Sequence, residues 1–303
     1  MPAEAIPSKA VDAIDIADLD ATMFRQRFQG RSRPMVITGA LGQIPEWTVE
    51  YLGRHYSGNR YAVRCYGAGK LDRPKREWRD YSQLREMSFD DYAAALSSGE
   101  ARRETMYLAQ INIAGTVPGE DLRPVLDDVA MRTGLERIPA NDINLWLGPG
   151  GHREPLHIDP GDSTLMMLNG EKRVALFPPA QSANLYPSPI SKGPIPFWVA
   201  QVDIERPEFD VHPRLKAAMP HRIDVTVKRG EILYIPAFWW HEVTALGDGP
   251  VCSVNRFWEV APPGRILSTA RAAMLWSMAK VPWPVVITVD RTIRRVRERR
   301  PAQ

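Results

Sequence analysis

Short apolar runs separated by turn residues dominate the chain from residue 106 to about residue 260. Runs this short suit strands better than helices. They are 106–112, 143–147, 165–168, 173–177, 225–227, 232–235 and 251–255. Glycine- and proline-rich turns such as 148–151 and 178–179 lie between them. Many short strands at this density predict a mainly β fold, a double-sheet jelly roll or barrel.

One turn within this region carries a further prediction. Asn169-Gly170 separates the apolar runs 165–168 and 173–177. Both residues tolerate a positive φ angle, which tight hairpin turns require. The dipeptide therefore predicts that these two strands form a β-hairpin.

The regions on either side of this β-rich segment show helical as well as strand patterns. Residues 1–105 mix short helical patterns with turns and predict α/β elements packed on the barrel. Segments 34–37 and 61–66 predict strands, and 88–96 predicts a helix with a serine cap and an acidic first turn. Near the N-terminus, the spacing of five apolar residues is compatible with one face of an amphipathic helix: Ile14, Ile16, Leu19, Phe24 and Phe28.

Residues 263–303 become helical again. Arginines lie on one face of the expected helix. Four apolar residues recur on the opposite face: Val286, Val289, Ile293 and Val296. The basic stretch 291–300 predicts a solvated helix face, with contact to nucleic acid or an acidic membrane as the alternative.

Composition narrows the class of protein. The chain has 303 residues, 39 Lys+Arg against 36 Asp+Glu, 44% hydrophobic and 25% charged residues. These values match soluble globular proteins and exclude a wholly disordered chain, which could not bury enough apolar surface. A formal charge of +3 gives no general electrostatic case for nucleic-acid binding. The 27 prolines favour many short elements with fixed turns.

Cysteine usage and the chain ends predict a cytoplasmic protein. Cys65 and Cys252 are too few for a disulfide framework or a cysteine-based zinc site. The acidic N-terminal stretch lacks the basic flank and apolar run of a signal peptide. The apolar stretch 274–289 is interrupted by Lys280 and two prolines, so it predicts no membrane span.

The candidate chemistry begins with His157 and Asp159. In an extended strand these positions point to the same face, so both side chains can bind one metal ion. A structural hydrogen-bonded pair is the alternative, because a His-x-Asp motif alone arises easily by chance. His241, which follows an apolar strand and two tryptophans, strengthens the metal hypothesis. Two imidazoles and one carboxylate form the facial triad of non-haem iron oxygenases, which leaves positions open for cosubstrate and O₂.

Several motifs in a fixed order extend this pattern. They are Trp146-Leu-Gly, Pro155-Leu-His-Ile-Asp159, 170–179, 185–187, 230–236, Trp239-Trp-His241 and Val254-Asn255. Residues 146–259 thereby resemble the cupin-like, JmjC-type family of Fe(II)- and 2-oxoglutarate-dependent oxygenases. Within that family they look closest to the branch containing the asparaginyl hydroxylase called factor inhibiting HIF.

This resemblance implies a fold and a set of site residues. A double-stranded β-helix catalytic domain would span 106–262, with 1–105 as its N-terminal cap. The implied iron ligands are His157, Asp159 and His241. The resemblance places Lys172 at the distal carboxylate of 2-oxoglutarate, Tyr107 beside the same carboxylate, and Asn255 near the cosubstrate and iron.

From the residues alone, alternatives stay open at these last positions. Lys172 fits a surface residue after a turn, and Tyr107 fits an ordinary core residue. His152 has the wrong strand parity to share a face with His157. Arg256 points opposite Asn255, which predicts an outer or salt-bridged side chain.

Two positions depart from the family pattern. Glu154 stands where the asparaginyl hydroxylase branch has a threonine that touches 2-oxoglutarate, and Ser163 stands where it has an asparagine. A carboxylate at position 154 would repel the cosubstrate unless it turns away or pairs with Lys172 or an arginine.

The implied activity is hydroxylation or demethylation of a peptide or protein side chain, or of an amino-acid-like small molecule, with release of succinate and CO₂. The resemblance also makes 263–303 a possible homodimer contact. Two alternatives remain: a zinc- or manganese-dependent cupin enzyme that does not use 2-oxoglutarate, and a catalytically silent cupin-like binding protein.

Overall fold

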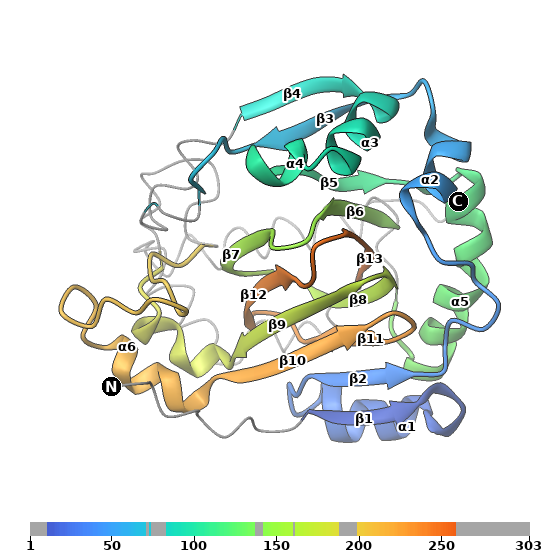
Figure 1. Cartoon of the computed structure of the whole chain (residues 1–303). Coiled ribbons are helices and arrows are strands. Elements are labelled where there is room, and N and C mark those ends of the chain that lie inside the picture. Colours follow the sequence, from blue (N-terminus) through green and yellow to red (C-terminus); the bar gives the residue numbers. More distant parts are fainter. Residues whose placement is uncertain are drawn as a thin grey trace, which may run out of the picture.

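The computed structural model of the protein describes residues 11–70, 73, 83–136, 142–159, 161–187 and 199–258 (Figure 1). Its strands form one nine-stranded and one four-stranded sheet. The larger sheet contains β1 (Asp12–Asp15), β2 (Met35–Thr38), β3 (Arg60–Cys65), β4 (Gln83–Ser88), β5 (Met106–Asn112), β6 (Asn144–Pro149), β8 (Asp162–Asn169), β11 (Ile232–Ile235) and β13 (Pro250–Trp258). The smaller sheet contains β7 (Arg153–Ile158), β9 (Glu171–Phe177), β10 (Ile223–Lys228) and β12 (Trp240–Ala245).

The eight strands from β6 onward make a double-stranded β-helix. The larger sheet has the order β1-β2-β11-β8-β13-β6-β5-β3-β4, and the smaller has the order β10-β9-β12-β7. Along the chain, β6 to β9 alternate between the two sheets, and β10 to β13 alternate again after one step within the smaller sheet. Strands that cross repeatedly between two facing antiparallel sheets define a jelly roll. The prediction of a mainly β jelly-roll core is therefore confirmed.

The turn at Asn169-Gly170 is present, but the predicted hairpin is wrong. Gly170 adopts a φ of 72°, as such a turn requires. However, β8 pairs with β11 and β13, whereas β9 pairs with β10 and β12. Leu165 and Met167 of β8 share a buried cluster with Val174 and Leu176 of β9. The turn thus carries the chain from one sheet to the other, because both strands bury an apolar face in the interior between the sheets.

The N-terminal elements differ from the predicted single helix. Ile14 lies in β1, and Ile16 begins a short 3₁₀ turn. Asp20 then caps the helix α1 (Ala21–Phe24) by accepting hydrogen bonds from the backbone N–H groups of Thr22 and Met23. A π-helical turn, Arg25–Gln29, continues it. The apolar spacing is real, but a parallel pairing of β1 with β2 uses its first part as a strand.

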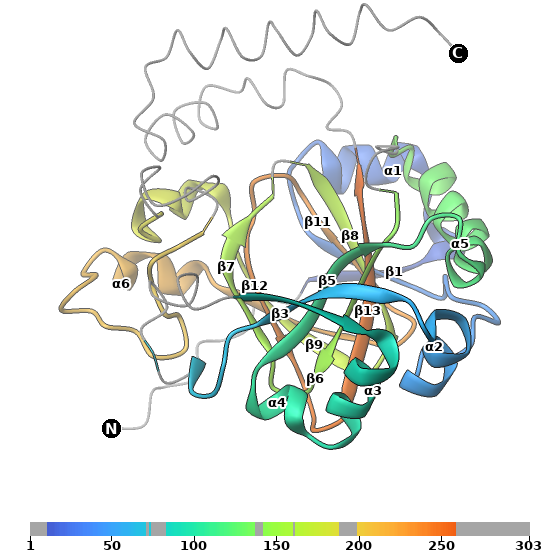
Figure 2. The same ribbon diagram turned by 90° about the horizontal axis from the view of Figure 1, so that it is seen from above.

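Helices cover the outside of the larger sheet. They are α2 (Val49–Tyr56), α3 (Phe89–Ser97), α4 (Glu100–Arg103) and α5 (Val117–Thr133), and with α1 they surround that sheet in Figure 2. One buried cluster joins their apolar faces to this sheet, as Leu52, Leu126 and Leu145 illustrate. A second cluster packs the segment that contains α6 (Leu215–Ala218) on the outer face of the smaller sheet. A third fills the interior between the sheets.

Some predictions fall outside these residues. The helices expected for 263–303, their dimer contact and the basic stretch 291–300 lie beyond the described part of the chain. The division at residue 105 stays a prediction, although β3 and β4 continue the sheet to which β5 belongs. Within the described residues, no helix is both long enough and apolar enough to cross a membrane.

Candidate metal centre

The three predicted metal ligands lie together at one point of the smaller sheet. His157 on β7 pairs directly with His241 on β12, and Asp159 follows the end of β7. The imidazole centroids of the two histidines are 4.1 Å apart, and Nε2 of His241 is 3.4 Å from Oδ2 of Asp159. One ligand atom from each of the three residues lies within 4.8 Å of the others. The structure thus brings the three side chains within reach of a single ion.

Backbone carbonyls fix both imidazole rings. Nδ1 of His157 is 2.7 Å from the carbonyl oxygen of Pro155, and Nδ1 of His241 is 3.0 Å from that of Trp239. A carbonyl oxygen only accepts hydrogen bonds, so each Nδ1 carries the proton of the neutral ring. In the neutral form of each ring, Nε2 then carries the lone pair that a metal ligand needs.

The electrostatics favour the protonation states that a metal needs. Burial lowers the pKa of His157, and the neighbouring His241 lowers it further, so the neutral ring is favoured. Burial opposes ionisation of Asp159, but contact with His241 and the nearby His157 outweigh it and lower the pKa. Two neutral imidazoles and one carboxylate are a fitting donor set for Fe(II), Mn(II) or Zn(II).

A β-bulge in β7 changes which side chains face the interior. His157 lies opposite His241, yet Glu154 lies opposite Val243, so β7 holds one extra residue between these pairs. An extra residue reverses the alternation of side chains along a strand. Glu154 therefore shares the interior with His157, and Oε1 of Glu154 is 3.0 Å from Nε2 of His152. The prediction that His152 points to the other face is wrong for this reason.

Lys172 is buried beside two hydroxyl groups. Its Nζ donates to Oγ of Ser253 at 2.6 Å and to the hydroxyl of Tyr107 at 3.4 Å. Only 3% of the residue is exposed, so the surface alternative does not hold. Burial lowers the pKa of Lys172 to about 8. Among the described residues, no carboxylate forms an ion pair with this ammonium group. A buried ammonium group whose hydrogen bonds go to hydroxyls rather than to a carboxylate is costly and favours an anionic ligand.

The ring of Tyr107 is in close contact with His152 and Gly148. Its ring stacks on that of His152, with the centroids 3.8 Å apart. A Cβ atom added to Gly148 would lie 2.4 Å from Cδ2 of Tyr107. The glycine of the Trp146-Leu-Gly motif is therefore required by the close approach of this ring.

The third predicted cosubstrate residue, Asn255, lies on the same strand face as Ser253. Oδ1 of Asn255 accepts a hydrogen bond of 2.7 Å from Nε1 of Trp146, whose ring centroid is 5.8 Å from that of Tyr107. Tyr107, Lys172 and Asn255 thus border one polar region of the interior. The sequence analysis missed Ser253, although its position two residues before Asn255 on a strand was a usable signal.

Glu154 neither turns away nor pairs with Lys172. Its carboxylate is 3.7 Å from Nη1 of Arg64, on β3, in addition to its contact with His152. Burial alone would raise the pKa of Glu154, but the hydrogen bond from His152 and the charges of Lys70 and Arg64 hold it well below the usual value. Ser163, the second departure from the family pattern, is buried on β8.

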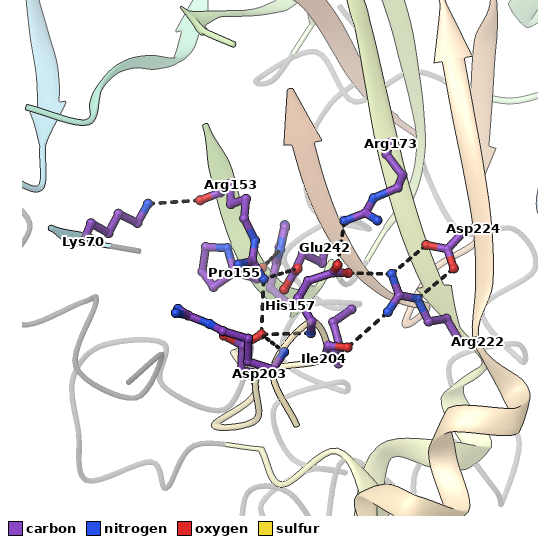
Figure 3. Close-up of polar contacts among 12 residues, drawn as sticks. Lys70, Arg153, Pro155, His157, Arg173, Asp203, Ile204, Arg222, Asp224 and Glu242 are labelled. Atoms are coloured by element: carbon purple, nitrogen blue, oxygen red, sulfur yellow. Dashed lines mark hydrogen bonds and ion pairs between the residues drawn. The ribbon is translucent and has the colours of Figure 1, made fainter. Parts of the chain in front are cut away.

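An ion-pair network backs the centre on the outer face of the smaller sheet (Figure 3). Nη2 of Arg153 is 2.8 Å from Oε1 of Glu242 and 3.3 Å from Oδ1 of Asp203. The backbone carbonyl of Arg153 also accepts a hydrogen bond of 3.0 Å from Nζ of Lys70. Because Glu242 directly follows His241, this network ties β7 to β12 immediately behind the two histidines.

The network continues along the sheet and was not predicted from the sequence. Glu205 contacts both Arg173 of β9 and Arg222, and Arg222 in turn contacts Asp224 of β10. By contrast, the prediction for Arg256 is confirmed in its salt-bridged form. That side chain is buried and donates to Asp142 at 2.6 Å.

Comparison with known proteins identifies the family. The profile of the cupin-like domain matches residues 20–263, which is most of the chain. The chain belongs to the cupin-like domain family. The predicted family is thereby confirmed, whereas the resemblance to the asparaginyl hydroxylase branch in particular stays a prediction.

Relatives of this cupin-like protein include a JmjC domain-containing protein and a lysine-specific demethylase. It is 29% identical over 240 residues to JmjC domain-containing protein D of Dictyostelium discoideum, covering 74% of this chain and 52% of that protein. It is 29% identical over 248 residues to lysine-specific demethylase 8 of Danio rerio, covering 79% of this chain and 56% of that protein. It is 32% identical over 143 residues to HSPB1-associated protein 1 of Mus musculus, covering 46% of this chain and 29% of that protein. The chain thus spans about half, or less, of the length of these curated relatives.

Proposed function

We propose that this cupin-like protein is an Fe(II)- and 2-oxoglutarate-dependent oxygenase. One observation supports this function above all: His157, Asp159 and His241 converge, and backbone carbonyls occupy Nδ1 of both imidazoles, which leaves Nε2 of each ring for a metal. Three protein ligands on one side of an ion leave its other positions open, which this chemistry requires. The names of the JmjC-type relatives point the same way.

The residues of the chain take distinct roles in this proposal. His157, Asp159 and His241 would hold the iron, and the carbonyls of Pro155 and Trp239 orient the two rings. When bound, iron and 2-oxoglutarate together supply the activation of O₂, with release of succinate and CO₂.

The polar region of the interior would bind the cosubstrate. Lys172 would pair with the distal carboxylate of 2-oxoglutarate, and the hydroxyls of Tyr107 and Ser253 orient the ammonium group. Asn255 borders the same region and keeps Trp146 in place. The charge-assisted contact at Lys172 supplies binding energy because the site excludes most water.

For the substrate we propose a peptide or protein side chain, or an amino-acid-like small molecule, which is hydroxylated or demethylated. Relatives named lysine-specific demethylases support a protein substrate. A cytoplasmic location and a homodimer formed through residues 263–303 remain predictions from the sequence.

A zinc- or manganese-dependent cupin enzyme without 2-oxoglutarate is the second candidate. The carboxylate of Glu154 inside the pocket favours it, because a second carboxylate would be repelled there. The buried ammonium of Lys172 favours the oxygenase instead. For a catalytically silent binding protein, the intact ligand set would have no use.

An anaerobic titration tests the function. Metal-free protein receives Fe(II) and then 2-oxoglutarate, and the visible charge-transfer band of the chelate is recorded. We expect a band in the native protein, its loss in His241→Ala, and a much higher 2-oxoglutarate requirement in Lys172→Met. Metal binding without a band would reject the oxygenase and favour the second candidate. No metal binding at all would reject both enzymes.

A further inference from the structure

The pocket proposed for 2-oxoglutarate contains a carboxylate of its own. Glu154 reaches the interior through the bulge in β7, and its side chain is only 14% exposed. Its negative charge acts on Lys172, where it partly opposes the effect of burial on the pKa, and it also acts on Tyr107. The carboxylate is thus close enough to influence whatever anion binds Lys172.

Arg64 is placed to compensate this charge. It belongs to β3, directly opposite Tyr107 of β5 in the sheet register. Its Nη1 is 3.7 Å from Oε2 of Glu154, and its guanidinium lies 5.9 Å from the ring centroid of Trp146. A cation over an aromatic ring is held in position without losing its charge.

His152 supplies the other contact to Glu154 but not a full positive charge. Burial lowers the pKa of His152 to about 4, against the raising effect of its hydrogen bond with Glu154. At neutral pH the ring therefore donates a hydrogen bond as a neutral group. Among the described side chains in direct contact with Glu154, Arg64 is the one with a full positive charge, and it shares the compensation of this carboxylate with the nearby ammonium of Lys70.

We propose that Arg64 is a positioning residue for the cosubstrate, which acts by neutralising Glu154 so that Lys172 can accept the distal carboxylate of 2-oxoglutarate. This rests on the proposed function. Arg64 would have no direct contact with the cosubstrate. Its effect should therefore depend on the charge at position 154 and on the presence of a distal carboxylate in the ligand.

The test compares two ligands in four forms of the Fe(II)-loaded protein under anaerobic conditions. The forms are the native protein, Arg64→Gln, Glu154→Gln and the double variant. The ligands are 2-oxoglutarate and 2-oxobutanoate, which has the same keto-acid end but no distal carboxylate. Kd is measured by titration calorimetry, and thermal unfolding checks that every form is folded.

We expect Arg64→Gln to weaken 2-oxoglutarate binding by roughly three- to tenfold, at most the equivalent of one pKa unit, because Lys70 still compensates part of the charge of Glu154. Binding of 2-oxobutanoate should change by less than about twofold, since only the charge at the distal end differs. In the Glu154→Gln background, the same arginine substitution should leave 2-oxoglutarate affinity nearly unchanged. Arg60→Gln is the matched control, because Arg60 lies on the same strand and, among the described residues, its side chain donates to the carbonyl of Glu86 rather than to Glu154.

Three results would overturn the role of Arg64. Unchanged 2-oxoglutarate affinity in Arg64→Gln would show that no compensation is needed. Equal weakening in both Glu154 and Glu154→Gln backgrounds would mean direct binding by Arg64. Equal weakening of both ligands would mean general damage to the pocket. If native protein binds neither ligand, the proposed function fails first, and this inference fails with it.

Discussion

Gly148→Ala should damage the protein through a single steric conflict. The added methyl group would lie 2.4 Å from Cδ2 and 2.8 Å from Cε2 of Tyr107, whereas carbon atoms in contact are about 3.5–4.0 Å apart. The overlap is therefore about 1 Å or more. The ring has little room to retreat, because it is 3% exposed and stacked on His152. Overpacking of this kind costs about 1–3 kcal/mol of unfolding free energy.

The same displacement should reach the pocket. If the ring of Tyr107 moves, its hydroxyl loses the 3.4 Å contact with Nζ of Lys172. A lost hydrogen bond of about 0.5–1.5 kcal/mol corresponds to roughly two- to tenfold weaker 2-oxoglutarate binding.

Urea denaturation measures the stability change, with Gly249→Ala as the control. Nothing lies within 4 Å of a Cβ at position 249, so that substitution should be neutral within about 0.5 kcal/mol. In a Tyr107→Ala background the methyl group has space, and Gly148→Ala should cost at least about 1 kcal/mol less than in the native protein. The steric explanation is refuted if Gly148→Ala is as stable as its control, or if its cost is the same in both backgrounds.

Two further predictions concern charges near the centre. The pKa of His152 is lowered from 6.5 to about 4, so the unfolded chain binds more protons between these values. The contribution of neutral His152 to the free energy of unfolding should be fully present above pH 6.5. It should decrease by up to about 3 kcal/mol as the pH falls to 4 and below. His152→Gln should flatten this profile in urea titrations, and an unchanged profile would contradict the assignment to His152. Glu242→Ala removes the buried contact with Arg153, which keeps Asp203. We expect the free energy of unfolding to decrease by about 2–3 kcal/mol. This is less than the loss of a whole buried ion pair, because Arg153 retains Asp203 as a partner. Asp248→Ala, which breaks an exposed pair with Arg102, should cost less than about 1 kcal/mol, and equal losses in both variants would contradict this reasoning.

The sequence predicted the jelly roll well because strand signals there are local. The apolar runs 232–235 and 173–177 coincide with β11 and with most of β9. Turn residues mark where each strand ends, but they do not say which strand is its neighbour. The Asn169-Gly170 turn was therefore recognised while its pairing was not, since pairing depends on the buried face shared across the interior.

The bulge in β7 and the helix α5 were beyond such local signals. Nothing in Arg153–Ile158 marks an extra residue, because the bulge is defined only against β12. The helix α5 was missed because Pro118 and Pro124 resemble breaks. Pro118 lies in the first helical turn, where its missing N–H group costs nothing. Burial of Leu122, Leu126 and Val129 then stabilises the helix despite Pro124.

The pairing of β7 with β12 also has a consequence for how the protein folds. His157 and His241 are neighbours across the sheet, although β8 to β11 come between them in the chain. Contacts between residues so distant in sequence require closure of a long loop before they return any free energy, which slows folding. The ligand set therefore exists only when the whole sequence of crossings has been completed. During refolding, metal binding at this centre should consequently appear only when the native topology has formed. It should appear later than the far-ultraviolet circular dichroism signal of the strands.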